Sequence, residues 1–206
     1  YGSSVFEGIR VYKSPKGSVA FRLTDHILRM KNSAKIYYME IPYTVENLVS
    51  SCKEIVKKNN LLEGSYIRPI AYRGYGEMGV AGNHEEPATC SIAAWEWGSY
   101  LGDNGLEDGV DVCVSSWKRV SPNTLPSLAK AGGNYLSSIL ITLEAKRQGF
   151  TEGIALNEGG FISEGAGENI FIASAGKLIT PPSSASILPG LTRDTVIRLA
   201  KEINIE

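Results

Sequence analysis

A stretch rich in glycine and aromatic residues, running from Trp95 to Leu106, divides the sequence into two parts that each mix strand-like and helix-like patterns. The stretch itself follows neither the period of an amphipathic helix nor that of a strand. A chain of 206 residues is long enough for one large domain or two small ones. We therefore expect an α/β (α+β) protein with a small α+β domain over residues 1–94, an interdomain loop at 95–107 and a larger domain over 108–206.

Two helices are predicted in the first part. Thr24 and Asp25 can cap a helix that runs to about Tyr37, and Thr44 can cap a second one. Apolar residues recur at helical spacing after each cap, so one face of each helix should be buried. The residues predicted on these faces are Ile27, Ala34 and Tyr38 in the first helix and Leu48, Cys52, Ile55 and Val56 in the second.

Strand-like runs surround these helices. One covers residues 19–23, and two longer ones cover Ser65–Arg73 and Ala88–Trp95. Pro69 has no N–H to donate to a neighbouring strand, so it places its strand at a sheet edge or at a bulge.

The second part opens with a strand in which Val110, Val112 and Val114 alternate with polar residues. Two hairpins are predicted, at 154–164 and 170–180, and two helices, at 134–148 and from about Thr192 onward. The residues predicted on the buried helix faces are Leu136, Ile139, Leu140 and Leu143, then Val196, Leu199, Ala200 and Ile203.

Composition excludes several functional classes. Hydrophobic residues make up 43% and charged residues 21%, which is typical of a globular protein. The net charge of −1 argues against nucleic acid as a partner, and no apolar run reaches the roughly 20 residues that span a membrane. Three scattered cysteines and two isolated histidines predict neither disulfides nor a metal site, and a cytoplasmic protein is expected.

The glycine pattern at 74–79 matches the G-x-G-x-x-G spacing of dinucleotide-binding loops. Such a loop should open a helix whose N-terminus holds a pyrophosphate. Residues 80–87 instead have the composition of a loop, so an ordinary loop is favoured.

Lys130 lies in Leu-Ala-Lys-Ala-Gly-Gly-Asn-Tyr, with small or apolar neighbours and no adjacent acidic residue. Burial lowers the pKa of a lysine and makes its amine a nucleophile that can form an imine with an aldehyde. The two glycines would let a ring approach closely. An ordinary lysine in a surface loop is the alternative.

Two more segments carry chemistry. Glu164 ends a predicted strand before Gly-Ala-Gly-Glu-Asn, and a carboxylate there can keep a pyridine nitrogen protonated. Thr192 opens the last helix after Pro-Gly, where N–H groups form an anion site. A polar bulge and an ordinary N-cap are the alternatives. Together with Lys130, these are the parts that pyridoxal 5'-phosphate needs.

With these residues, the chain resembles the branched-chain amino-acid aminotransferases, which are class IV, fold type IV pyridoxal-phosphate enzymes of the D-amino-acid aminotransferase-like fold. The resemblance extends over nearly all of the chain. It is carried by residues 1–10, 33–37, 66–69, 97–101, 115–117, 122–124, 129–138, 152–156, 162–169 and 189–194.

The resemblance implies a role for individual residues. Lys130 would form the imine with the cofactor and shuttle a proton, while Glu164 would face the pyridine nitrogen. Cofactor contacts are further implied for Arg29, Tyr135, Gly167, Leu188, Leu191 and Thr192, with Arg29 and the Leu191 and Thr192 amides on the phosphate and Tyr135 on the phenolic oxygen. Substrate contacts are implied for Tyr1, Phe6, Gly8, Tyr66, Arg68, Met78, Val80, Trp97 and Tyr100, with Tyr66 on the α-carboxylate, and Arg68, Tyr1 and Tyr100 on the distal carboxylate of glutamate.

The implied reaction is transamination of leucine, isoleucine and valine with 2-oxoglutarate, giving branched 2-oxo acids and glutamate. The implied assembly is a homodimer or a larger homo-oligomer built from dimers. D-amino-acid transaminase and aminodeoxychorismate lyase share the fold and remain alternatives, although as families they lack the combined blocks at 6–10 and 66–69. A non-catalytic domain that binds a phosphate-bearing ligand is an alternative from another class. Because Tyr1 lies in what resembles the middle of an element and the family has additional chain at both ends, we expect a segment of a longer protein.

Overall fold

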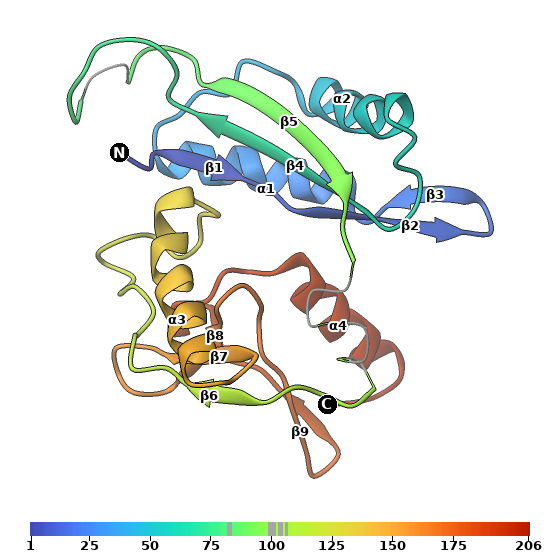
Figure 1. Cartoon of the computed structure of the whole chain (residues 1–206), viewed down its shortest axis with the longest axis vertical. Coiled ribbons are helices and arrows are strands. Elements are labelled where there is room, and N and C mark those ends of the chain that lie inside the picture. Colours follow the sequence, from blue (N-terminus) through green and yellow to red (C-terminus); the bar gives the residue numbers. More distant parts are fainter. Residues whose placement is uncertain (82–83, 99–101, 103–104, 106) are drawn as a thin grey trace. The chain divides into compact units, whose positions relative to one another are not determined.

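The computed structural model describes residues 1–206 except 82–83, 99–101, 103–104 and 106, and it divides into two units (Figure 1). Unit 1 comprises residues 1–103 and 129–133, and unit 2 comprises residues 104–128 and 134–206. The segment 129–133 therefore belongs to unit 1, although in sequence it follows residues assigned to the second half.

Unit 1 is an antiparallel sheet covered by two helices. Strand β4 lies inside the sheet, with β5 along one side and both β1 and β2 along the other, and β3 lies outside β2. The elements are β1 Ser4–Phe6, β2 Ile9–Ser14, β3 Gly17–Ala20, α1 Leu23–Ile36, α2 Val45–Lys58, β4 Ser65–Tyr72 and β5 Thr89–Glu96.

The core of unit 1 lies between one face of this sheet and the two helices. Ile67 and Ala71 of β4 are fully buried against residues of α1 and α2 such as Met30 and Cys52. Because successive side chains of a strand point to opposite faces, Tyr66 and Arg68 of β4 lie on the other face of the sheet. Two of the predicted site residues thus lie on the face of the sheet that points away from the core.

The predicted edge position of Pro69 is wrong, because β4 has neighbours on both sides. Pro69 pairs with Ile92 of β5, and its carbonyl on the opposite side accepts a hydrogen bond from the Glu7 N–H at 2.9 Å. Glu7 and Gly8 form the gap between β1 and β2, so the missing N–H of Pro69 faces a point where the neighbouring strand is interrupted. A proline is tolerated inside the sheet for this reason.

The N-terminus of α2 agrees with the prediction, whereas α1 differs from it at both ends. Thr44 caps α2 as predicted, accepting a hydrogen bond from the Asn47 N–H at 3.2 Å. Helix α1 instead starts before Thr24 and Asp25, and its N-cap is Arg22 in the left-handed conformation with φ of 48°. Tyr38 lies beyond the C-terminus of α1 and is exposed, so its predicted burial is wrong.

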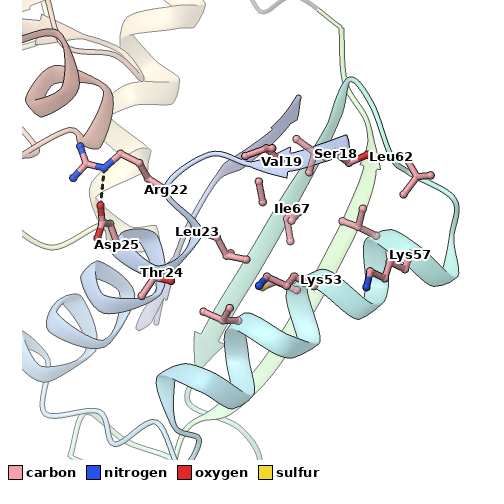
Figure 2. Close-up of a pocket in the computed structure, with 15 residues that line it drawn as sticks. Ser18, Val19, Arg22, Leu23, Thr24, Asp25, Lys53, Lys57, Leu62 and Ile67 are labelled. Atoms are coloured by element: carbon pink, nitrogen blue, oxygen red, sulfur yellow. Dashed lines mark hydrogen bonds and ion pairs between the residues drawn. The ribbon is translucent and has the colours of Figure 1, made fainter. Parts of the chain in front are cut away.

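A groove of about 480 Å³ runs between the strands and helices of unit 1. Figure 2 shows apolar side chains along it and Lys53 and Lys57 of α2 at its side. None of the residues lining it is one of the predicted site residues. The predicted site residues therefore lie outside this groove.

Unit 2 contains a small mixed sheet, a hairpin and two long helices. Strands β6 and β7 are parallel, β8 is antiparallel to β7, and β9 and β10 form the second hairpin. Both predicted hairpins are confirmed. The elements are β6 Val112–Val114, η1 Gly132–Asn134 (which begins in unit 1), α3 Tyr135–Arg147, β7 Glu152–Leu156, β8 Ile162–Gly165, β9 Ile172–Ser174, β10 Lys177–Ile179, η2 Ser183–Ala185 and α4 Leu191–Glu202.

The predicted buried faces of α3 and α4 are wrong. Leu136, Ile139, Leu140 and Leu143 are 40–66% exposed, whereas α3 buries Ser138, Ile141 and Ala145. Of the four residues predicted for the last helix, only Ala200 is buried. The buried residues of α3 face the sheet, where β7 approaches the helix closely. A Cβ added at Gly153 would lie 2.7 Å from Ile141 Cγ2.

Candidate active site

The segment that carries Lys130 is attached to the start of the sheet in unit 1. The Lys130 N–H donates to Ser33 Oγ at 3.0 Å, and the Phe6 N–H donates to the Lys130 carbonyl at 3.0 Å. The next residue, Ala131, bridges to Val5 of β1. A glycine is needed at 132, since a Cβ there would lie 2.3 Å from Ser4 Oγ. Backbone contacts thus hold Lys130 beside Phe6, and its Nζ lies 5.0 Å from the centre of the Phe6 ring.

Arg68 lies among aromatic rings on the face of the sheet opposite the core. Its Cζ is 4.7 Å from the centre of the Phe6 ring and 5.8 Å from that of Trp95. Its Nη2 donates to Tyr66 Oη at 3.1 Å, while its buried Nε has no hydrogen-bond partner among the described residues. The arginine is therefore a half-buried cation held in an apolar setting.

Tyr66 is fixed from two sides. Its ring packs against Trp97 with centroids 4.6 Å apart, and a Cβ at Gly8 would lie 1.7 Å from its Oη. Gly8 is thus required for this close approach. Unit 1 brings together six of the predicted site residues, which are Phe6, Gly8, Tyr66, Arg68, Trp97 and Lys130.

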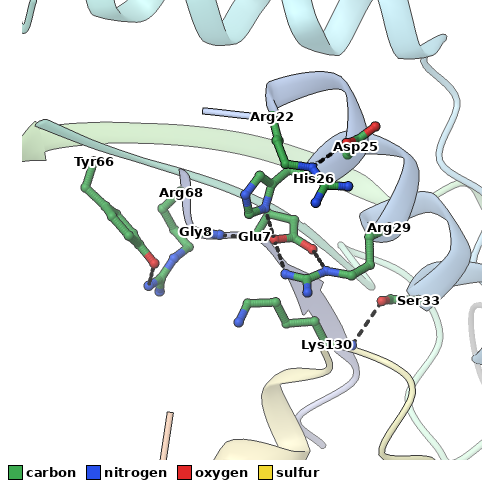
Figure 3. A network of polar contacts seen from close by, with 10 residues as sticks. All are labelled: Glu7, Gly8, Arg22, Asp25, His26, Arg29, Ser33, Tyr66, Arg68 and Lys130. Atoms are coloured by element: carbon green, nitrogen blue, oxygen red, sulfur yellow. Dashed lines mark hydrogen bonds and ion pairs between the residues drawn. The ribbon is translucent and has the colours of Figure 1, made fainter. Parts of the chain in front are cut away.

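A buried ion-pair network lies next to this group (Figure 3). Arg29 donates from Nε to Glu7 Oε1 at 2.6 Å and from Nη2 to Glu7 Oε2 at 2.7 Å, and His26 Nδ1 is 2.7 Å from Oε2. Burial alone raises the pKa of the Glu7 carboxyl, but the hydrogen bonds of His26 and Arg29 and their charges lower it to about 2. Because an ionised carboxylate only accepts hydrogen bonds, His26 Nδ1 is the donor.

Helix α1 connects this network with the lysine. Its residues His26, Arg29 and Ser33 are spaced so that they follow one stripe of the helix. The first two bind Glu7, and the third binds the backbone of Lys130. Glu7 and His26 were not among the predicted site residues. The available signal was an acidic residue between the apolar positions Val5 and Ile9.

In unit 2, Glu164 is buried, and its partners include Arg119, Asn169 and Leu188. Arg119 Nη2 lies 2.8 Å from its Oε1, and Asn169 Nδ2 and the Leu188 N–H each donate to Oε2 at 3.0 Å. Leu188 thus uses its N–H on Glu164. Neither Arg119 nor Asn169 was among the predicted site residues.

The start of α4 is linked to Glu164 through Asn169. Asn169 Nδ2 also donates to the Leu188 carbonyl at 2.9 Å, and a Cβ at Gly190 would lie 2.0 Å from Asn169 Oδ1. Gly190 is the N-cap of α4 and has no side chain of its own to accept from the first turn, which begins with Leu191 and Thr192. Unit 2 therefore places the buried carboxylate of Glu164 and the N-terminus of α4 next to the same asparagine, Asn169.

Two more carboxyl groups lie near Glu164. Glu168 Oε2 accepts from the Gly167 N–H at 2.6 Å, and Glu152 is buried. Burial, the charge of Glu152 and a hydrogen bond with Glu152 raise the pKa of Glu168 to about 7, and the charge of Glu164 adds to this. The charges of Glu152 and Glu164 thus both act on the Glu168 carboxyl.

The remaining predicted site residues are less enclosed. Tyr1, Met78 and Val80 are 91–98% exposed, and Tyr135 is the first residue of α3. Tyr100 lies outside the described residues. No helix follows the glycine pattern at 74–79 among the described residues, which agrees with the loop interpretation.

The described residues contain no group of three or more side chains that could hold a metal ion, and all three cysteines are free thiols. Among them, Cys52 is fully buried, which raises its pKa to about 12. No described helix has the length and apolar character needed to cross a membrane.

Comparison with known proteins places these features in a family. The family described as "Amino-transferase class IV" matches residues 4–206. The branched-chain-amino-acid aminotransferase of Escherichia coli K12 is 52% identical over the full chain, which spans 66% of that protein's length.

Solved structures agree with this relationship. The crystal structure of the Escherichia coli branched-chain amino acid aminotransferase has a TM-score of 0.98 at 52% identity, over 100% of this chain and 67% of that one. A second branched-chain amino acid aminotransferase, solved in complex with N-(5'-phosphopyridoxyl)-L-glutamate, has a TM-score of 0.92 at 42% identity, over 100% and 66%. The enzyme from the archaeon Thermoproteus uzoniensis, solved with norvaline, has the same TM-score and identity, over 100% and 67%. The predicted fold type IV aminotransferase fold is thereby confirmed. The chain belongs to the class IV aminotransferases, in the group of the branched-chain amino-acid aminotransferases.

Proposed function

We propose that the protein transfers the amino group of leucine, isoleucine or valine to 2-oxoglutarate with pyridoxal 5'-phosphate as cofactor. One observation carries the proposal: an amine, Lys130 Nζ, and a cation, Arg68, both lie about 5 Å from the same apolar ring, Phe6. The relative that was solved with phosphopyridoxyl-glutamate supports the cofactor and glutamate as a substrate.

The donor set fits this cofactor. Glu164 is an acceptor suited to a ring nitrogen, and the N-terminus of α4 suits a phosphate group. Arg29, with Leu191 and Thr192, would hold the phosphate, while Tyr135 would bind the phenolic oxygen, and Gly167 would let the ring approach. When bound, the cofactor supplies an aldehyde that links to amines and a ring that withdraws electrons.

Lys130 would act as the proton carrier. Its Nζ takes the proton from the α-carbon of the amino acid and delivers a proton at the end of the transfer. The Ser33 and Phe6 hydrogen bonds fix the Lys130 backbone, so the flexible side chain can move while its Cα stays in place. Proton removal and delivery by one amine therefore require no movement of the sheet.

The substrate pocket would serve two kinds of side chain. Phe6 and Trp97 offer apolar surface to a branched side chain, and Arg68 offers a cation to the distal carboxylate of glutamate. Tyr66 would contact the α-carboxylate. We assign Tyr1, Met78, Val80 and Tyr100 to the same pocket in the complete protein.

We also propose a cytoplasmic homo-oligomer. The exposed apolar side chains of Leu136, Ile139, Leu140 and Leu143 on α3 support an assembly that covers them. The proposed domains are those expected from the sequence, with residues 108–206 forming most of the cofactor-binding domain.

The proposal is tested by reducing the complete holoenzyme with borohydride and mapping the modified lysine by mass spectrometry. Cofactor should be attached to Lys130, and leucine should abolish the visible absorption band of the unreduced enzyme. Lys118, whose Nζ donates to the Glu158 carbonyl, provides an internal control. Labelling at Lys118, or a band that responds to D-alanine and not to leucine, would contradict the proposal.

A further inference from the structure

Arg119 is a buried arginine in direct contact with Glu164. We infer that Arg119 is a positioning residue that keeps Glu164 ionised, so that the proton shared by Glu164 and the cofactor ring stays on the ring nitrogen. The inference rests on the proposed function, because it requires Glu164 to face that nitrogen.

The geometry of the pair supports a fixed contact. Arg119 Nη2 lies 2.8 Å from Glu164 Oε1, and each side chain is only 6% exposed. The Arg119 N–H donates to the Leu156 carbonyl at 2.9 Å, and Nη1 donates to Ser138 Oγ at 3.2 Å. The arginine is therefore anchored at its backbone and at its guanidinium.

The burial of Arg119 is unfavourable in one respect. Its Nε is buried and has no hydrogen-bond partner among the described residues. A buried donor without a partner costs about 1–3 kcal/mol. A side chain that only filled space would avoid this cost, so its charge beside Glu164 is the feature that needs an explanation.

The surroundings of Glu164 explain why a cation is needed. Glu168 lies close enough for the charge of Glu164 to contribute to its raised pKa, and Glu152 in turn acts on Glu168. Neighbouring carboxylates repel one another's negative charge, so each of them favours protonation of the other. Without a cation, Glu164 would compete with the ring nitrogen for the proton.

The Arg119 charge acts most strongly on the group that it contacts, so the closer group decides where the shared proton lies. An opposite charge in contact with a carboxylate lowers its pKa by about 1–3 units. The guanidinium touches Glu164 directly, so it acts more strongly on the carboxylate than on a group that contacts Glu164 without contacting Arg119. Arg119 thus favours an ionised Glu164 with a protonated ring nitrogen, and a protonated ring withdraws electrons better.

The test uses the complete holoenzyme loaded with cofactor labelled with ¹⁵N at the ring nitrogen. Arg119→Gln keeps a donor near Oε1 but removes the charge, whereas Arg119→Lys keeps the charge. The ¹⁵N signal of the wild type and of Arg119→Lys should be that of a pyridinium. In Arg119→Gln the equilibrium should shift at least tenfold toward the neutral ring, and kcat should fall more than the KM for leucine rises.

The controls separate this inference from the function it rests on. Ser138→Ala removes the Nη1 contact and should leave the ¹⁵N signal unchanged. Glu164→Gln should give a neutral ring, and a pyridinium signal in that variant would overturn the assignment of Glu164 itself. If Glu164→Gln behaves as expected but Arg119→Gln retains a pyridinium, the role of Arg119 is overturned. Failure of both Arg119→Gln and Arg119→Met to fold would equally overturn it, since it would assign the residue to the fold.

Discussion

Arg29 binds both carboxylate oxygens of Glu7, with Nε 2.6 Å from Oε1 and Nη2 2.7 Å from Oε2. The Glu7 side chain is completely buried, and that of Arg29 is 14% exposed. This paired geometry fixes the plane of the guanidinium. It also connects α1 to the gap between β1 and β2, next to Phe6.

Glu7→Gln should destabilise the protein strongly, because it leaves the Arg29 charge buried without its counter-ion. Breaking a buried pair in this way costs about 3–5 kcal/mol. Urea unfolding of the complete protein measures the loss. Glu63→Gln is the matched control, since its pair with Lys13 is exposed, with side chains 60% and 74% accessible. That variant should lose less than about 1 kcal/mol, and similar losses in both variants would contradict the prediction.

The acid limb of the stability curve should depend on Glu7. Its pKa is about 2 in the folded state against an ordinary value of 4.5. A lowered pKa adds stability that is fully present above pH 4.5 and is lost as the pH falls toward 2. Melting temperatures of wild type and Glu7→Gln, recorded from about pH 6 down to about pH 2.5, should therefore converge. Curves that remain parallel over this range would show that the carboxylate of Glu7 does not titrate in this way.

Glu168 should have the opposite effect at higher pH. Burial and the charge of Glu152 raise its pKa to about 7, so ionising it in the folded state costs stability. The protein should lose stability as the pH rises from about 4.5 through 7. Glu168→Gln, which resembles the protonated form, should melt higher than wild type at about pH 8 and nearly equally at about pH 5. Glu85→Gln, at a side chain 88% exposed, should show no such crossover.

Arg68→Met should separate the two half-reactions. In the proposed function it removes a charge-assisted contact that only glutamate would use, which is worth roughly 1.5–3 kcal/mol, or about ten- to a hundredfold in rate. Single turnovers followed through the cofactor spectrum should show this loss with glutamate and little change with leucine. Equal losses with both substrates would assign Arg68 to the α-carboxylate or to the fold.

Local signals allowed much of the secondary structure to be predicted. The cap of α2 at Thr44 and the turn at 157–160 of the first hairpin depend on residues only a few positions apart. The faces of α3 and α4 could not be predicted in this way. Leucine and isoleucine occur on several sides of α3, so no single stripe identifies the buried face. The close packing of Ile141 against Gly153 decides it.

Lys130, Glu164 and Thr192 are predicted from their own local sequence and the other site residues from the resemblance to a family, but the residues that hold them are predicted by neither. Glu7 binds Arg29 across 22 positions of sequence, and the contact of Lys130 with Ser33 spans 97. Such pairs follow from the arrangement of strands and helices. Among these pairs, only Glu7 gave a signal in the sequence. It is a charged residue at a position where the strand pattern requires an apolar one.

At the end of β1, the neighbouring residues Phe6 and Glu7 serve opposite faces of one sheet, because successive side chains of a strand alternate. Phe6 faces Lys130 and Arg68, while Glu7 faces the helix that carries Arg29. A deletion of one residue in β1 would exchange the faces of all side chains before the gap. In evolutionary terms, this short strand can accept substitutions but hardly any change in length.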